Sequence, residues 1–82
     1  MGGALMNKNR RKELQHIIDG LDILKSNLED IQTEEEEYRD NIPENMQSSE
    51  KYEIAEAACD AMSEAIDNLE EAIGNIESAI EG

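Results

Sequence analysis

Aromatic residues and cysteine are nearly absent from this 82-residue chain. It has no Phe or Trp, two Tyr and a single Cys. One cysteine forms no internal disulfide and builds no cysteine-based zinc site, which excludes disulfide-stabilised and zinc-finger-like small domains. The apolar side chains are therefore mostly Leu, Ile, Met and Ala, and they make a thin core. Because a chain this short buries a low fraction of its surface, we expect it to associate with itself or with a partner.

Long hydrophobic runs are also missing. No run approaches the roughly 18 apolar residues of a membrane span, and the start lacks the roughly 7–15-residue apolar stretch of a secretory signal peptide. The opening Met-Gly-Gly looks like a myristoylation start, but Met6 stands where that motif has Ser or Thr. We therefore expect a cytoplasmic protein with no membrane contact, in which residues 1–8 are a flexible leader.

Positive charge is scarce as well. Seven Lys and Arg stand against 21 Asp and Glu, which gives a formal net charge of −14. Phosphate backbones repel such a chain, so we expect no direct binding of nucleic acid. The one basic cluster is Lys8, Arg10, Arg11 and Lys12. It either lies beside Glu77 and Glu81 at the end of a second helix, where the helix dipole favours cations, or contacts nucleic acid.

Two segments carry apolar residues at alternating steps of three and four, which is the seam of a helix that packs on another helix. The first seam is Leu14, Ile17, Leu21, Leu24, Leu28, Ile31, Glu35, Tyr38 and Ile42. The second is Tyr52, Ala55, Cys59, Met62, Ile66, Leu69, Ile73, Ile76 and Ile80. Glu35 is the polar member, and it either fixes the register or marks where the helices separate. The pattern predicts helices over 9–41 and 49–81.

Pro43 and its neighbours predict a turn over 42–48, with Ser48 or Ser49 capping the second helix. Helices of equal length with a short connection predict an antiparallel hairpin over 9–82. If the chain folds back near position 45, the seams pair throughout, with only Glu35 lacking an apolar partner. The pairs are Leu14 with Ile76, Ile17 with Ile73, Leu21 with Leu69, Leu24 with Ile66, Leu28 with Met62, Ile31 with Cys59 and Tyr38 with Tyr52.

The second helix has a further stripe of small residues beside its seam. The stripe is Ala58, Ala65, Ala72 and Ala79. Small side chains permit close approach of another backbone, so these residues predict self-association. The predicted fold is all-α, an antiparallel coiled-coil hairpin that forms a homodimer and thereby a four-helix bundle.

Residues with catalytic or metal-binding chemistry are few. Glu13 and His16 have the Glu-x-x-His spacing of di-iron bundles, but His16 falls two positions from the seam and should face solvent. Cys59 lies on the seam and is expected to be a small buried hydrophobe. No nucleophile-and-base set or phosphate-binding loop is present. We therefore expect no enzyme activity, no cofactor and no metal.

Acidic residues dominate the expected surface. On the second helix they step by three or four along one ridge, which consists of Glu53, Glu56, Asp60, Glu64, Asp67 and Glu71. The first helix adds Asp19, Asp22, Glu29, Asp30, Glu34, Glu37 and Asp40. A turn rises about 5.4 Å, slightly less than the spacing of phosphates along a DNA strand. The ridge either imitates a nucleic-acid backbone toward a basic protein or only keeps the bundle soluble.

Protein contacts usually depend on Tyr, Trp and Arg side chains. In this chain such residues occur near the turn, where Tyr38 and Arg39 are joined by Met46. We expect specific partner contacts at this end, with the acidic ridge supplying long-range attraction.

The stretch 35–50, which contains Tyr-Arg-Asp-Asn-Ile-Pro-Glu-Asn, is followed by heptads of the Ala-Ile-Asp-Asn-Leu-Glu-Glu kind. Together they resemble short acidic two-helix proteins of phages and prophages of Gram-positive bacteria, over nearly the whole chain after Met6. The resemblance implies a mobile-element accessory protein, a class that includes inhibitors of host enzymes and of bacterial defence systems. The expected function is a protein-binding inhibitor or nucleic-acid mimic that docks on a basic, nucleic-acid-binding host or defence protein. The alternative is a structural, self-assembling coiled coil.

Overall fold

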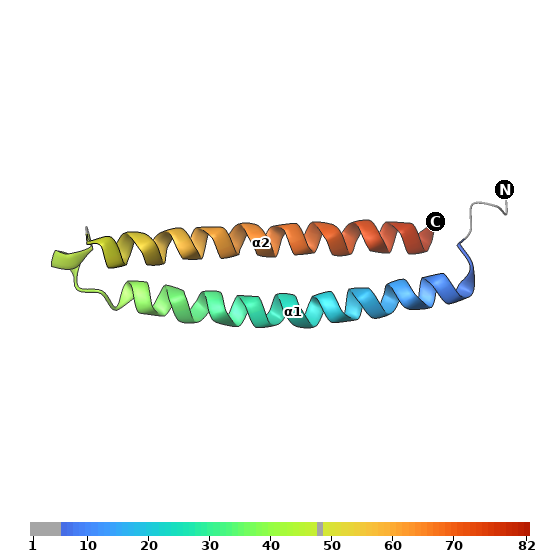
Figure 1. The fold of residues 1–82 in the computed structure, drawn as a ribbon, viewed down its shortest axis with the longest axis horizontal. Coiled ribbons are helices and arrows are strands. Elements are labelled where there is room, and N and C mark those ends of the chain that lie inside the picture. Colours follow the sequence, from blue (N-terminus) through green and yellow to red (C-terminus); the bar gives the residue numbers. More distant parts are fainter. Residues whose placement is uncertain (1–5, 48) are drawn as a thin grey trace.

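The computed structural model describes residues 6–47 and 49–82, which form an all-α helical hairpin. Helix α1 spans Lys8–Asp40, a short 3₁₀ helix η2 spans Glu44–Met46, and α2 spans Glu50–Glu81. The two long helices lie side by side and run in opposite directions, joined at the end that carries η2 (Figure 1). The molecule is a thin rod of 64 × 18 × 12 Å.

Side-chain caps begin both long helices. The Asn7 side chain accepts a hydrogen bond from the Arg10 backbone N–H at 2.8 Å, and the Ser49 hydroxyl accepts one from Tyr52 at 3.4 Å. Lys8 therefore belongs to α1 and not to a leader. Residues 1–5 of the expected leader and Ser48, the other expected cap, lie outside the described residues.

The turn is built around Pro43, as the sequence predicts. Asn41 ends α1, and the Ile42 N–H donates to the Arg39 carbonyl at 3.1 Å. Pro43 then precedes η2, and its carbonyl accepts the Met46 N–H at 2.8 Å. This turn reverses the chain, so that α2 runs back along α1.

The core lies along the α2 seam, where the sequence places it. Ala55, Cys59, Ile66 and Ile73 are buried, and the other predicted seam residues of α2 are half-buried. The Gln32 side-chain amide donates to the Cys59 carbonyl at 3.2 Å. This contact brings Gln32 alongside Cys59, one residue from the predicted pairing of Ile31 with Cys59.

The predicted orientation of α1 is wrong by one residue at every second seam position. Ile18 is 3% exposed, whereas its neighbour Ile17, which the sequence placed in the seam, is 49% exposed. Leu24, Ile31 and Tyr38 are likewise at least half exposed, so these residues and Ile17 lie outside the buried seam in which the sequence pairs them with α2. The residues of α1 and the turn that are turned toward α2 are Leu14, Ile18, Leu21, Lys25, Leu28, Gln32, Glu35, Arg39 and Ile42.

The reason for this difference is that long polar side chains serve as partial core residues. Lys25 and Arg39 cover apolar surface with their methylene stems, and Gln32 satisfies its amide on the α2 backbone. Their positions toward α2 also place Ile18 in the most buried site of α1. The two alternatives share Leu14, Leu21, Leu28, Glu35 and Ile42, so the hydrophobic pattern alone selects the wrong one.

Candidate interaction surfaces

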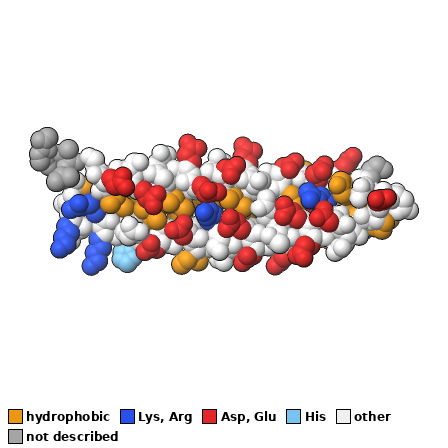
Figure 2. All heavy atoms as spheres, turned by 180° about the vertical axis from the view of Figure 1, so that it is seen from behind, with side chains coloured by type: hydrophobic (Ala, Val, Ile, Leu, Met, Phe, Trp, Pro, Cys, Tyr) orange, Lys and Arg blue, Asp and Glu red, His pale blue; other side chains and the backbone are white. Residues whose placement is uncertain are grey.

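Carboxylates from both helices gather on one side of the hairpin, which we call the acidic face. They are Asp19, Asp22, Glu29, Glu36 and Asp40 of α1, and Glu53, Glu56, Asp60, Asp67 and Glu70 of α2. These residues flank the seam on the same side in an antiparallel helix pair. Figure 2 shows acidic side chains on both helices along a central line of hydrophobic side chains. All but Glu36 are exposed, and Glu36 is half-buried.

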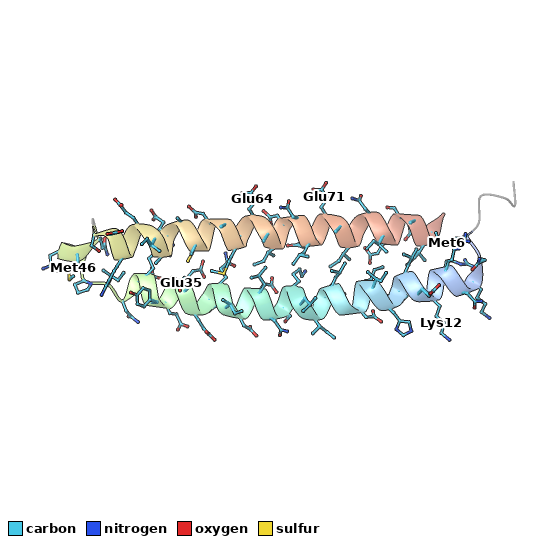
Figure 3. All side chains as sticks on the ribbon, viewed as in Figure 1. Met6, Lys12, Glu35, Met46, Glu64 and Glu71 are labelled. Carbon is cyan, nitrogen blue, oxygen red and sulfur yellow. The ribbon has the colours of Figure 1, made fainter. Side chains whose placement is uncertain are left out.

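The acidic ridge predicted on α2 is exposed along its whole length. Four of its members, Glu53, Glu56, Asp60 and Asp67, belong to the acidic face. Glu64 and Glu71 instead project from the side of α2 opposite to α1 (Figure 3). The ridge is therefore not one surface, and a flat partner that contacts the acidic face does not reach its last two members.

Few of these charges are neutralised by a neighbour. Among residues 6–47 and 49–82, one salt bridge is present, from Arg39 Nε to Asp40 Oδ1 at 3.1 Å. This hydrogen bond raises the pKa of Arg39. Arg39 forms no ion pair with Glu35 or Glu36, which lie one helical turn before it on α1. The acidic face thus combines dense negative charge with little internal compensation.

The basic cluster gathers at the end of the molecule where α1 begins (Figure 2). The end of α2, with Glu77 and Glu81, lies at the same end of the hairpin, as the sequence predicts (Figure 1), although no salt bridge within 4 Å joins the cluster to either residue in the described part of the chain. Lys8, Arg10, Arg11 and Lys12 therefore concentrate positive charge at one end of an otherwise acidic rod.

The residues predicted to bind a partner at the turn end do not all share one side. Tyr38 is 50% and Met46 is 47% exposed, whereas the Arg39 side chain is only 22% exposed. Consecutive helical residues point about 100° apart. Arg39 leans toward the acidic face with Asp40, while Tyr38 lies on the opposite side of the seam. A partner on the acidic face therefore meets Arg39 and not the Tyr38 ring.

The opposite side of the hairpin is largely uncharged, and we call it the neutral face. It contains Ile17, Leu24, Ile31 and Tyr38 of α1, with Ile54, Ala58, Ala65, Ala72 and Ala79 of α2. Ala58, Ala65 and Ala72 are half-buried at the edge of the seam, and Ala79 is exposed. The sequence signal for this face is the presence of apolar residues on two sides of α1, since Ile17 and Ile18 cannot both point at α2.

The residues with catalytic potential are not assembled into a site. Cys59 is 3% exposed, and this burial raises the pKa of its thiol. Glu13 and His16 are exposed on α1. In the described ranges, no group of three or more His, Cys, Asp or Glu side chains is placed to hold a metal ion. A shallow, open hollow of about 320 Å³ is lined by Met6, Arg10, Glu13 and Leu14.

None of the described helices has an apolar stretch long enough to cross a membrane. No protein family, curated protein or solved structure matches the chain.

Proposed function

We propose that this chain is a non-enzymatic, protein-binding accessory protein of phage or other mobile-element origin. It acts in the cytoplasm and docks its acidic face on a basic, nucleic-acid-binding host or defence protein, as an inhibitor or nucleic-acid mimic. The observation that carries this proposal is the gathering of exposed carboxylates from both helices on one side of a thin rod. The resemblance of the turn and heptads to acidic two-helix phage proteins supports the mobile-element origin.

The chemistry of the acidic face favours a basic partner. Its carboxylates are exposed and hold few cations of their own, so they remain available to Lys and Arg side chains. Charge of one sign along an extended surface also attracts an oppositely charged protein from a distance and speeds association. Such attraction is screened within about 10 Å at 0.1 M salt, so binding should be sensitive to salt.

The test compares two variants that have the same net charge and differ in which side is changed. The face variant carries Glu56→Lys, Asp60→Lys, Asp67→Lys and Glu70→Lys. The control carries Asp30→Lys, Glu37→Lys, Glu64→Lys and Glu71→Lys, all of which are exposed on the outer sides of the two helices. Each is used with the wild type to capture proteins from a lysate of a Gram-positive bacterium.

We expect the wild type and the control to retain a basic protein at low salt and release it at about 0.5 M NaCl, and the face variant to retain none. Equal capture by all three proteins, or capture that salt does not affect, would contradict docking through the acidic face. Adding Arg39→Ala with Met46→Ala to the wild type tests whether the turn end supplies specific contacts.

The alternative is a structural, self-assembling module whose acidic residues only confer solubility. The exposed apolar residues of the neutral face favour this reading. It predicts no salt-sensitive partner and unchanged self-association in the face variant.

A further inference from the structure

We propose that the neutral face is the binding surface for a second copy of this chain, and that α1 of each copy packs on α2 of the other in a two-fold symmetric four-helix bundle. The sequence assigned self-association to the Ala stripe of α2 alone. The structure adds Ile17, Leu24 and Ile31 of α1 to this surface. They lie on the same side as the Ala stripe and are 49%, 60% and 53% exposed. The proposal is independent of the acidic face and its partner.

The hairpin exposes more surface than a chain of its size usually does. One hairpin exposes 6026 Å², whereas a folded monomer of its 9.2 kDa mass typically exposes about 4,900 Å². The elongated hairpin therefore leaves about 1,100 Å² more surface in water than a globular chain of its mass, and roughly 800 Å² from each copy suffices for a standard interface. The buried apolar residues of the described chain are Ile18, Ala55, Cys59, Ile66 and Ile73. This core is small for a domain that folds alone.

The distribution of charge also favours the neutral face as the contact between two copies. Two copies with a net charge of −14 each repel one another wherever their carboxylates meet. The middle of the neutral face is bordered by uncharged residues, Gly20 and Asn27 on α1 and Asn68 and Asn75 on α2. Charged residues on its border are found toward the ends of the helices. A basic partner favours the acidic face, whereas the neutral face suits an equally acidic copy of the same chain.

Large side chains on α1 match small side chains on α2 across the neutral face. The register marked by Gln32 and Cys59 places Leu24 at nearly the same height along the rod as Ala65. The same relation holds for Ile17 with Ala72 and for Ile31 with Ala58, because both stripes repeat every seven residues. A two-fold axis parallel to the helices preserves these heights. It therefore places each large residue of α1 against an Ala of α2 in the second copy. Each Ala of α2 likewise meets a large residue of α1 in the second copy.

This geometry makes the interface closed and self-complementary. Leu24 meets Ala65 of the second copy, and Ala65 meets Leu24 of that copy. All neighbouring helices in the bundle are then antiparallel, as in the hairpin itself. The acidic faces of both copies remain outside, one on each side of the bundle.

The experiment compares two adjacent residues of α1. Leu24 is 60% and Ile23 is 63% exposed in the hairpin, but Ile23 lies on the outer side of α1 and Leu24 on the neutral face. Leu24→Glu and Ile23→Glu introduce the same charge. The masses of the wild type and both variants are measured by sedimentation equilibrium at about 1 to 100 µM, with helicity followed by circular dichroism.

We expect the wild type and Ile23→Glu to have twice the mass of one chain, and Leu24→Glu to dimerise about 100-fold more weakly, because an unpaired carboxylate in a closed apolar interface is strongly unfavourable. Ala65→Glu should act like Leu24→Glu, whereas Ala57→Glu, which is exposed on the outer side of α2, should not. The wild-type mass decides the matter even if a variant loses helicity. A wild-type mass of one chain, or of three or more chains, would overturn the proposal. Equal weakening by Ile23→Glu and Leu24→Glu would also overturn it.

Discussion

Ile17 and Ile18 give a sensitive test of how α1 is turned, because they are identical side chains in opposite environments. Ile18 is 3% exposed against α2, and Ile17 is 49% exposed on the neutral face. Replacing each in turn by Ala removes the same atoms at adjacent positions of one helix. Helix propensity changes equally in both variants, so the difference between them reports packing.

The expected magnitudes follow from burial. Ile→Ala removes three carbon groups, which contribute about 0.8 kcal/mol each when fully buried. At Ile18 this amounts to about 2.4 kcal/mol, and the cavity left against α2 raises the loss to about 3 kcal/mol. At Ile17 about half of the surface is already in water and no cavity forms, so the loss is about 1 kcal/mol. The midpoint temperature should therefore fall by about 12–24 °C for Ile18→Ala and by about 4–8 °C for Ile17→Ala.

Urea and thermal unfolding, followed by circular dichroism, measure both losses. Both variants are compared with the wild type at a concentration at which sedimentation finds single copies, so that contacts with a second copy do not contribute. An equal or larger loss for Ile17→Ala under these conditions would refute the observed orientation of α1. Such a result would indicate that Ile17 faces α2, as the hydrophobic pattern predicts.

Three further predictions concern the core thiol, the helix caps and the net charge. Buried Cys59 should react with a thiol reagent at pH 8 about 100-fold more slowly in the native protein than in urea. Burial raises the pKa of Cys59 above its ordinary 9.0, so the thiol loses its proton in the unfolded chain at a lower pH than in the native protein. The free energy of unfolding should therefore fall as the pH rises past 9, and Cys59→Ala should reduce that decline. Asn7→Ala and Ser49→Ala should each lower the free energy of unfolding by about 1 kcal/mol in thermal denaturation, whereas Ser78→Ala, within α2, should not. If neither capping variant loses stability, the two side chains do not stabilise the helix ends. Raising NaCl from about 0.01 to 0.5 M should raise the midpoint temperature, because salt screens repulsion among the carboxylates, and a fall would indicate that ion pairs dominate instead.

The sequence by itself determines the elements and their order. Steps of three and four, two capping residues and a proline are local features, and each acts within a few residues of its own position. The helices were therefore predicted to within one residue at each end, and the hairpin followed from their equal length. The α2 seam is also predicted, because Cys59, Ile66 and Ile73 are larger than the adjacent Ala58, Ala65 and Ala72 and so mark the side that packs on α1.

The two faces were only partly predictable. The acidic ridge follows from the spacing of carboxylates on α2, but the acidic face combines two helices and depends on how each is turned. Its α1 half therefore needed the tertiary structure. The ridge predicted from α2 alone includes Glu64 and Glu71, which the structure places outside this face.

The orientation of α1 was decided by tertiary packing. Its seam positions Leu14, Leu21 and Leu28 are compatible with a partner on either side, and the more hydrophobic side was the wrong choice. In the fold, Lys25 and Arg39 lie over apolar surface and Gln32 bonds to the α2 backbone, so polar residues occupy half-buried places. Hydrophobic periodicity identifies the apolar positions of α1, but it does not decide which of them face α2. That choice depends on the shape of α2 and on long side chains that span the edge of the seam.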